Sequence, residues 1–328
     1  MRYGLYLNPQ FPNDGDPRQA LEGLLAQARM AKGAGFSSIW LPHHFATNPV
    51  RMFDTHTLMA RLTAEVPETT IGPAVLLLPV QNPVFVAEQA AMLDWLSGGN
   101  YVLAAGLGYR SEEFAIHGAH ISERVGRMVE SIQLIRRLWS EERVTHHGQY
   151  YHLDDVGLSL RPVRPEGCPI WVGGSVTASV KRAAKVGDAW IASFSQTFDE
   201  LASLKQDYDA ARKEAGLPPP PTQPVCRECF IGPDGADALD ICRPALLYKY
   251  KAYASWGNAN LNADLEANFD AFVDSHFIVG DAARVKDRVA RVVASTGSDH
   301  LVLRMHWPGL DPAETLKSIE RAKAITGA

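Results

Sequence analysis

Residues 169–192 read PIWVGGSVTASVKRAAKVGDAWIA, and this stretch indicates how the chain folds. Two short apolar runs, at 169–173 and 187–192, flank a segment of helical period at 175–186. A strand, a helix and a second strand in this order form a crossover unit, in which the two strands lie parallel in one sheet. The stretch therefore predicts a parallel sheet whose strands are joined by helices.

The same alternation continues toward both ends of the chain. Eight short apolar runs are separated by amphipathic segments. Eight strands with intervening helices favour an α/β fold of the single (β/α)8 TIM barrel type over an open sheet. We therefore predict one barrel domain spanning residues 1–328. The predicted strands are 2–8, 37–41, 71–78, 101–107, 169–173, 187–192, 225–231 and 300–305, and the predicted helices are 17–34, 52–65, 83–97, 123–140, 175–186, 198–215, 282–295 and 312–325.

Two segments break this alternation. Residues 143–165 show β-type alternation without helical period, so we predict an inserted β-hairpin with solvated histidines. Residues 244–275 form a long excursion before the last strand, and long excursions on one face of a barrel usually serve as lids or interfaces. The aromatic side chains of this lid-like excursion could line a substrate pocket or cover the barrel wall.

Composition restricts the expected partners. The net charge is −5 and the basic residues are spread along the chain, so we expect no nucleic acid and no membrane partner. The N-terminus lacks a secretory pattern, and no apolar run approaches the ~20 residues of a membrane helix. Four cysteines fit a reduced, cytoplasmic protein. Cys226 and Cys229 fall on a predicted strand, where residues three apart face opposite sides, so we predict no metal site.

Unusual residues follow several predicted strands at their C-terminal ends. In a (β/α)8 barrel these ends converge on one depression, which holds the active site. His43 and His44 follow the second strand, Gly106 and Tyr109 lie at the end of the fourth, and Phe194 follows the sixth. We expect these residues to surround one site.

The turn after the fifth strand has the chemistry of an anion site. Gly173 and Gly174 allow close backbone approach, and Ser175 opens a helix whose free amides and positive dipole end attract a phosphate. Taken alone, the same run could also be a tight turn with a helix cap. Arg124, at the start of another predicted helix, could supply the complementary charge. The turn thus indicates where a phosphorylated ligand would bind.

Together these motifs resemble the bacterial luciferase-like flavin-dependent monooxygenases, in one order and over nearly the whole chain. The resemblance implies an enzyme of the two-component type. It would use reduced flavin mononucleotide (FMN) from a separate reductase, with dioxygen, to oxygenate a small organic substrate through a carbon-4a hydroperoxyflavin. The segments that carry the resemblance are GLYLNPQFP, GFSSIWLPHHF, GPAVLLLPVQNP, AEQAAMLDWLSGG, GLGYRSEEFAIHG, SERVGRMVESIQLIRRLW, PIWVGGS and HLVLRMHWPG.

The resemblance also assigns roles to single residues. It makes His43 the candidate catalytic base, with a pKa near neutrality unless its surroundings shift it. It places His44 and Tyr109 in the substrate pocket, and it implies a homodimer formed by the helices at 52–65 and 83–97. The residues implied in cofactor binding are Ala74 and Val75, joined by a cis peptide under the flavin ring, together with Gly106, Phe194, Arg124, Gly174, Ser175 and Val176.

Three departures from luciferase leave other functions open. Pro42 replaces an acidic residue before the two histidines, Leu107 replaces an arginine that contacts phosphate, and Asn100 replaces another arginine. Light emission is therefore not implied. A related alternative is a deazaflavin-dependent hydride transferase, whose long anionic cofactor tail would favour a more basic groove. A further alternative is a non-catalytic partner subunit, although such a chain lacks the first histidine of the pair.

Overall fold

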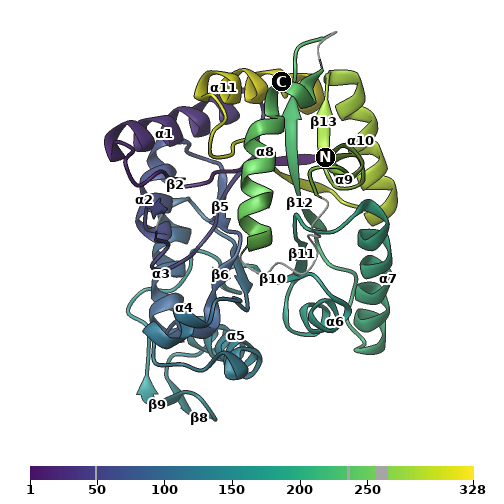
Figure 1. Ribbon diagram of the computed structural model, residues 1–328. Coiled ribbons are helices and arrows are strands. Elements are labelled where there is room, and N and C mark those ends of the chain that lie inside the picture. Colours follow the sequence, from purple (N-terminus) through teal and green to yellow (C-terminus); the bar gives the residue numbers. More distant parts are fainter. Residues whose placement is uncertain (49, 235–236, 256–264) are drawn as a thin grey trace.

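Parallel strands form a nearly closed barrel at the centre of the molecule (Figure 1). The computed structural model describes residues 1–48, 50–234, 237–255 and 265–328. The neighbouring strands follow the order β5, β3, β1, β14, β12, β11, β10, β7, β6, and every pairing along this path is parallel. Their bounds are β1 Arg2–Tyr6, β3 Ser38–Leu41, β5 Thr70–Pro73, β6 Leu76–Leu77, β7 Leu103–Gly106, β10 Ile170–Gly174, β11 Ala189–Ala192, β12 Pro224–Ile231 and β14 His300–Arg304.

The two ends of this path belong to the same part of the chain, and this closes the ring. β5 and β6 are separated only by Ala74 and Val75, which lie inside the predicted strand 71–78. β5 pairs with β3 on one side, β6 pairs with β7 on the other, and Ile71 forms a further parallel bridge to Tyr101. The predicted (β/α)8 barrel is thereby confirmed, with its third strand divided in two.

Helices surround the barrel, with α1–α3 on the left and α7 and α10 on the right of Figure 1. Several begin where a polar cap residue precedes them, as at Asp16, Asp54 and Asn82, whose side chains each accept a backbone N–H of the first turn. The predicted helices agree with the observed ones to within a few residues, apart from the last, which is divided. The bounds are α1 Pro17–Gly33, α2 Thr55–Glu65, α3 Pro83–Leu96, α5 Arg124–Ser140, α6 Thr177–Val186, α7 Phe198–Glu214, α10 Ala282–Thr296, α11 Pro312–Arg321 and α12 Lys323–Thr326.

Strand alternation divides the core into two layers. One set of strand residues packs outward against the helices, and the other fills the barrel interior. In the interior, Trp40 and Trp171 stack with ring centroids 4.8 Å apart. On β12, Cys226 belongs to the interior layer and Cys229 to the outer one, as the strand pattern predicts. The interior is thus a packed core.

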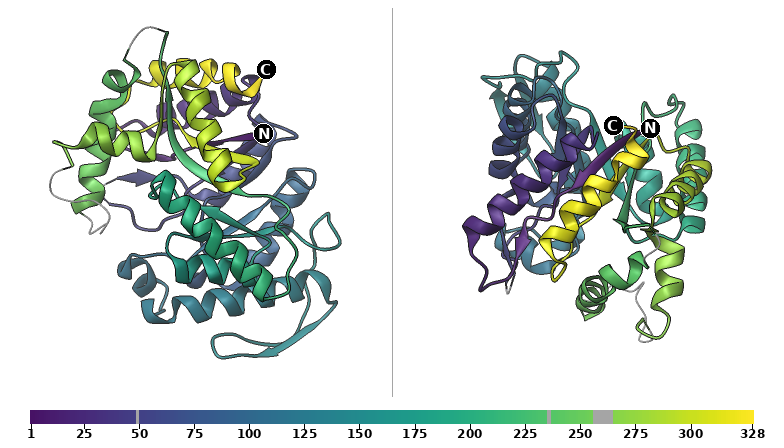
Figure 2. Two further views of the ribbon diagram at one scale, coloured as in Figure 1. Left: turned by 90° about the vertical axis from the view of Figure 1, so that its right-hand side faces the viewer. Right: turned by 90° about the horizontal axis from the view of Figure 1, so that it is seen from above.

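The predicted inserted hairpin is present at the end of the molecule opposite the two termini (Figures 1 and 2). It consists of the antiparallel strands β8 (Val144–His147) and β9 (His152–Val156). His147 and His152 are exposed, but His146 is half-buried and lies 3.1 Å from Glu130 of α5. The expectation of solvated histidines therefore holds for two of the three, because the hairpin packs on α5 through the third.

Some short elements have no counterpart in the predicted pattern. β2 and β4 form a small antiparallel pair, and β13 adds to β12. The predicted excursion 244–275 contains most of α8 and all but the last residue of α9, while residues 256–264 lie outside the described residues. Across the residues that the structure describes, no helix combines the length and apolar composition needed to span a membrane. The bounds are β2 Gln10–Phe11, β4 Arg51–Met52, α4 Ser111–Ile116, α8 Ala238–Ser255, α9 Phe269–His276 and β13 Ile278–Gly280, with 3-10 turns at Leu78–Val80 and Ile121–Glu123.

Candidate active site

A cavity of about 490 Å³ lies at the C-terminal ends of the strands, and we call it the glycine cavity. Its wall contains every residue that the sequence predicts for cofactor binding, together with Tyr109 and Leu107. The structure therefore brings segments from the C-terminal ends of β5, β7, β10 and β11 to one place, although the role of each residue stays a prediction. The predicted cofactor residues in this wall are Ala74, Val75, Gly106, Arg124, Gly174, Ser175, Val176 and Phe194.

One side of the glycine cavity is a ledge made by β5, β6 and β7. The peptide bond between Ala74 and Val75 is cis, at the position that the family resemblance implies. Gly106 of β7 lies against it, and a Cβ atom at Gly106 would lie 2.3 Å from Cγ2 of Val75. Because no side chain can project there without moving Val75, the ledge stays flat, as the face of a planar ring requires.

Another part of the cavity wall is formed by the start of α6 and two arginines. The amides of Ser175 and Val176 donate to the Ser179 hydroxyl at 3.0 and 3.1 Å, so this hydroxyl holds the turn. The amides of Thr177 and Ala178 belong to the first turn of the helix, where N–H groups have no intrahelical partner. The positive end of α6 therefore faces the cavity.

Arg124 and Arg182 both line this end of the cavity. Arg124 donates to the carbonyl of Gly108 at 3.3 Å. Burial, followed by the charge of Arg124, lowers the pKa of Arg182, so the two guanidinium groups feel each other's charge. Sequence reasoning missed Arg182. The signal that could have found it is its spacing of three and four residues from Ser179 and Ala178, which places all three on one face of α6.

A buried charged cluster supports the wall at Phe194. The Arg304 guanidinium lies 4.0 Å from the centre of the Phe194 ring and 5.0 Å from that of Tyr6. Glu228 of β12 binds Arg304 and also Lys249 of α8. Burial alone would raise the pKa of Glu228, but the charges of Arg304 and Lys249 lower it to about 2. This carboxylate thus joins the barrel mouth to α8.

A second cavity, of about 380 Å³, lies beside the first, and we call it the His44 cavity. Tyr109 lines both cavities, so they share a wall. His44 and Tyr109, which the sequence assigns to the substrate pocket, therefore both line this second space. Most of its wall is polar. The complete lining is Gln10, His44, Thr47, Asn48, Val50, Tyr109, Arg110, Ser111 and Glu112.

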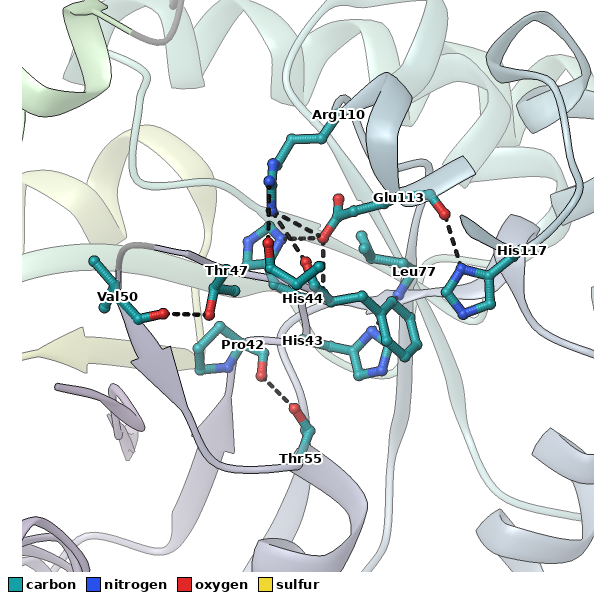
Figure 3. Close-up of polar contacts among 12 residues, drawn as sticks. Pro42, His43, His44, Thr47, Val50, Thr55, Leu77, Arg110, Glu113 and His117 are labelled. Carbon is teal, nitrogen blue, oxygen red and sulfur yellow. Dashed lines mark hydrogen bonds and ion pairs between the residues drawn. The ribbon is translucent and has the colours of Figure 1, made fainter. Parts of the chain in front are cut away.

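His44 is held by a buried carboxylate from α4, as Figure 3 shows. Its Nδ1 atom lies 3.0 Å from Oε1 of Glu113, which also accepts the backbone N–H of Phe45 at 2.9 Å. Burial would raise the pKa of Glu113, but the hydrogen bonds from His44 and Phe45 and the nearby Arg110 lower it. Glu113 is therefore a carboxylate that orients His44, and the sequence analysis gave it no role.

His43 has a different environment from its neighbour. It is 2% exposed and lines neither of the two cavities. Its Nδ1 accepts the N–H of Leu77 at 3.4 Å, and its Nε2 lies 3.1 Å from the side-chain amide of Gln81. Burial and then the charges of His56 and His44 lower the pKa of His43 to about 3. The surroundings thus shift the pKa of His43 away from neutrality, because the ring is withdrawn from water.

Comparison with known proteins agrees with the fold. The sequence profile of the luciferase-like monooxygenases matches residues 1–300. A relative from Kineococcus radiotolerans, an F420-dependent glucose-6-phosphate dehydrogenase, is 32% identical over 60% of this chain, which spans only 62% of that protein. An F420-dependent hydroxymycolic acid dehydrogenase from Mycobacterium tuberculosis is 30% identical over 88% of this chain and 80% of its own length.

Among solved structures, one similar fold is the oxygenating constituent of 3,6-diketocamphane monooxygenase from Pseudomonas putida, a type II Baeyer-Villiger monooxygenase in complex with FMN. Its TM-score is 0.81 at 22% identity, with 98% of this chain and 96% of the other covered. These matches include oxidoreductases that use either F420 or FMN. From the profile match and the barrel together, we conclude that the chain belongs to the luciferase-like monooxygenase family.

Proposed function

We propose that this protein is an FMN-dependent monooxygenase that binds reduced FMN in the glycine cavity. The observation that carries the proposal is that the flat ledge at Gly106 and two arginines line the same cavity. Within the described residues, neither Arg124 nor Arg182 has a carboxylate within ion-pair distance. A tricyclic ring with a phosphate on a flexible chain matches both ends of such a site.

Three other basic side chains near the barrel mouth lie close to carboxylates, and this favours FMN over a deazaflavin with a long anionic tail. Arg110, Arg127 and Lys181 lie near Glu113, Glu123 and Asp207, at 3.6, 2.8 and 3.8 Å. These acids neutralise cations that a polyanionic tail would otherwise use. Arg124 and Arg182 remain in the cavity wall, and their two positive charges match one phosphate dianion.

Reduced FMN, when bound, would supply the electrons that activate dioxygen. We assign the accompanying proton transfer to His44, because this imidazole lines the His44 cavity and Glu113 fixes its orientation. Because the carboxylate of Glu113 contacts Nδ1, Nε2 is the ring nitrogen left to hold or release a proton toward the substrate. Tyr109, shared by both cavities, would orient the substrate against the cofactor.

His43 remains the base that the family resemblance implies, but its contacts support a different assignment. Leu77 donates to its Nδ1, and the Gln81 amide occupies Nε2. We propose that His43 packs behind His44 and keeps the loop 42–45 in place. Its ring lies 4.6 Å from that of Phe45, centre to centre, which supports this structural role.

A second candidate function is deazaflavin-dependent hydride transfer, because the two relatives above are named as F420-dependent dehydrogenases. A histidine beside a carboxylate could equally accept the hydroxyl proton of an alcohol. Anaerobic titration of the purified protein with reduced FMN and with reduced F420 separates the two functions. Tighter binding of FMN, and incorporation of labelled dioxygen into a ketone or aldehyde from a screening panel, is the expected result. Tighter binding of F420, with its reduction by alcohols, would establish the second candidate.

We further propose that the protein pairs with a second copy of itself through α3 and receives its flavin from a separate reductase. The apolar side chains of α3 that project away from the core share one helix face, and Phe85 and Trp95 are 64% and 53% exposed. Met92 and Leu96 belong to the same face. Trp95→Lys should convert a dimer into a monomer in sedimentation velocity, whereas a parent protein that sediments as a monomer would refute the pairing.

A further inference from the structure

Arg182 is a cation without a partner in the wall of the glycine cavity. Its Nε atom is buried and has no hydrogen-bond partner. Within the part of the chain that the structure describes, the whole side chain forms no hydrogen bond and no ion pair. A partly buried guanidinium with five N–H donors and no acceptor is costly, and in natural proteins such groups usually meet a ligand or water.

The neighbours of Arg182 increase this cost. Arg124 lines the same cavity, and its charge, after burial, lowers the pKa of Arg182. Two like charges facing one space repel each other unless an anion lies between them. The start of α6 adds a further positive potential at the same place. Three independent sources of positive charge therefore meet at a cavity wall in which none of the described residues is acidic.

Arg124 reaches the glycine cavity from the α5 helix. A single arginine would leave a phosphate dianion only half neutralised. Arg182 reaches the cavity from a different element, the α6 helix, on the same face as Ala178 and Ser179.

We propose that Arg182 supplies the second cation of the phosphate site, beside Arg124, and that it makes the protein select phosphorylated over unphosphorylated flavin. The inference rests on the proposed function, because it assigns a specificity-determining contact within the same cofactor site. Arg124 and Arg182 would approach the phosphate from α5 and α6, with the first-turn amides of α6 between them. Arginine is suited to this task because its planar fork can bind two phosphate oxygens at once.

The test compares reduced FMN with reduced riboflavin, which differ only in the phosphate. Both are titrated anaerobically into the parent protein, Arg182→Leu, Arg182→Lys and the control Lys181→Leu, with quenching of tryptophan fluorescence as the signal. Lys181 is the adjacent residue of α6, but it is exposed and lies 3.8 Å from Asp207. Thermal unfolding without flavin shows that each variant is folded.

Arg182→Leu should lower the preference for FMN over riboflavin by about 10-fold to 100-fold, the usual effect of a hydrogen bond to a charged group. Riboflavin affinity should stay unchanged. Arg182→Lys should keep most of the preference, and Lys181→Leu all of it. An unchanged preference in Arg182→Leu, or an equal loss in Arg182→Lys, would overturn the assignment even though FMN binds.

Failure of the proposed function gives a different pattern. If the parent binds F420 and not FMN, the same variants are compared with F420 and its phosphate-free deazaflavin nucleoside. In that case the proposed monooxygenase is wrong, while the loss in Arg182→Leu still supports the phosphate contact. A parent that binds none of these flavins would refute both proposals at once.

Discussion

The two ends of the barrel each hold a histidine in a hydrogen bond, but the two histidines differ in what surrounds them. At the N-terminal ends of the strands, Nε2 of His300 lies 2.7 Å from the Ser38 hydroxyl, which also accepts the Trp40 indole N–H at 2.8 Å. At the C-terminal ends, Nδ1 of His44 lies 3.0 Å from Glu113. His300 is buried and lines neither cavity, whereas His44 lines one. A polar pair alone therefore does not mark a site, and an adjoining cavity is also needed.

The glycines of the two ends repeat this contrast. At the N-terminal ends of the strands, which we call the closed end, a Cβ atom on Gly4 would lie 2.3 Å from the Ser38 hydroxyl and 2.7 Å from the Trp40 indole nitrogen. At the C-terminal ends, which we call the open end, a Cβ atom on Gly106 would meet the side chain of Val75, which borders the glycine cavity. Ser38 and Trp40 beside Gly4 are enclosed by the packed core. Val75 beside Gly106 borders the glycine cavity, into which its side chain can move. Close approach at the closed end serves stability, and at the open end it shapes a binding surface.

Removing the imidazole at the open end should have the largest effect. His44→Ala should lower turnover by about 100-fold or more, because proton transfer to the substrate is lost. Reduced FMN should still bind, since His44 is outside the wall of the glycine cavity. Steady-state oxidation of a carbonyl compound that the parent protein accepts provides the rate, and anaerobic titration provides the affinity.

Two further variants serve as controls for this prediction. His300→Ala should lower stability but leave the turnover of the folded fraction unchanged. His43→Ala should lose less turnover than His44→Ala, because its ring nitrogens already contact Leu77 and Gln81. A larger loss in His43→Ala would restore His43 as the base and contradict the assignment to His44.

A methyl group added at each end should separate stability from binding. Gly4→Ala should lower the free energy of unfolding by roughly 1–3 kcal/mol, the usual cost of overpacking a filled core. Gly106→Ala should cost less, because Val75 can shift toward the cavity, but this shift should weaken binding of reduced FMN. Urea unfolding and flavin titration of both variants measure the two effects. Equal losses of stability, or unchanged FMN binding in Gly106→Ala, would contradict the contrast.

The closed end was largely predictable from the sequence, because it depends on periodicity. Apolar runs and helical segments locate the eight predicted strands and their helices to within a few residues. The exception is the strand 71–78, which is divided at Ala74 and Val75. Residue periodicity cannot show such a division, since the apolar run continues without interruption.

The open end was predictable only in part. Loop positions identified Gly106, Gly174, Ser175 and Phe194, because the ends of parallel strands must converge. Ala74, Val75 and Val176 followed only from the family resemblance. The choice between His43 and His44 was not available, since neighbouring loop residues have no period that fixes their directions. Glu113 reaches His44 from 69 residues away in the sequence, a non-local contact that a local pattern cannot reveal.

The smallest expected effect concerns acid stability at the closed end. Burial, followed by the charge of Arg2, lowers the pKa of His300 from 6.5 to about 3. Between these values the unfolded chain binds a proton that the folded protein excludes, so this group's contribution is intact above pH 6.5 and is lost as the pH falls toward 3. The loss is at most about 1.4 kcal/mol for each pH unit.

His300→Gln should therefore flatten the decline in unfolding free energy between pH 6.5 and 5, measured by urea titration at several pH values. His147→Gln, which changes an exposed histidine of the hairpin, serves as the control and should follow the parent. An identical decline in His300→Gln would mean that the histidine at the closed end is solvated, and the contrast with the open end would fail.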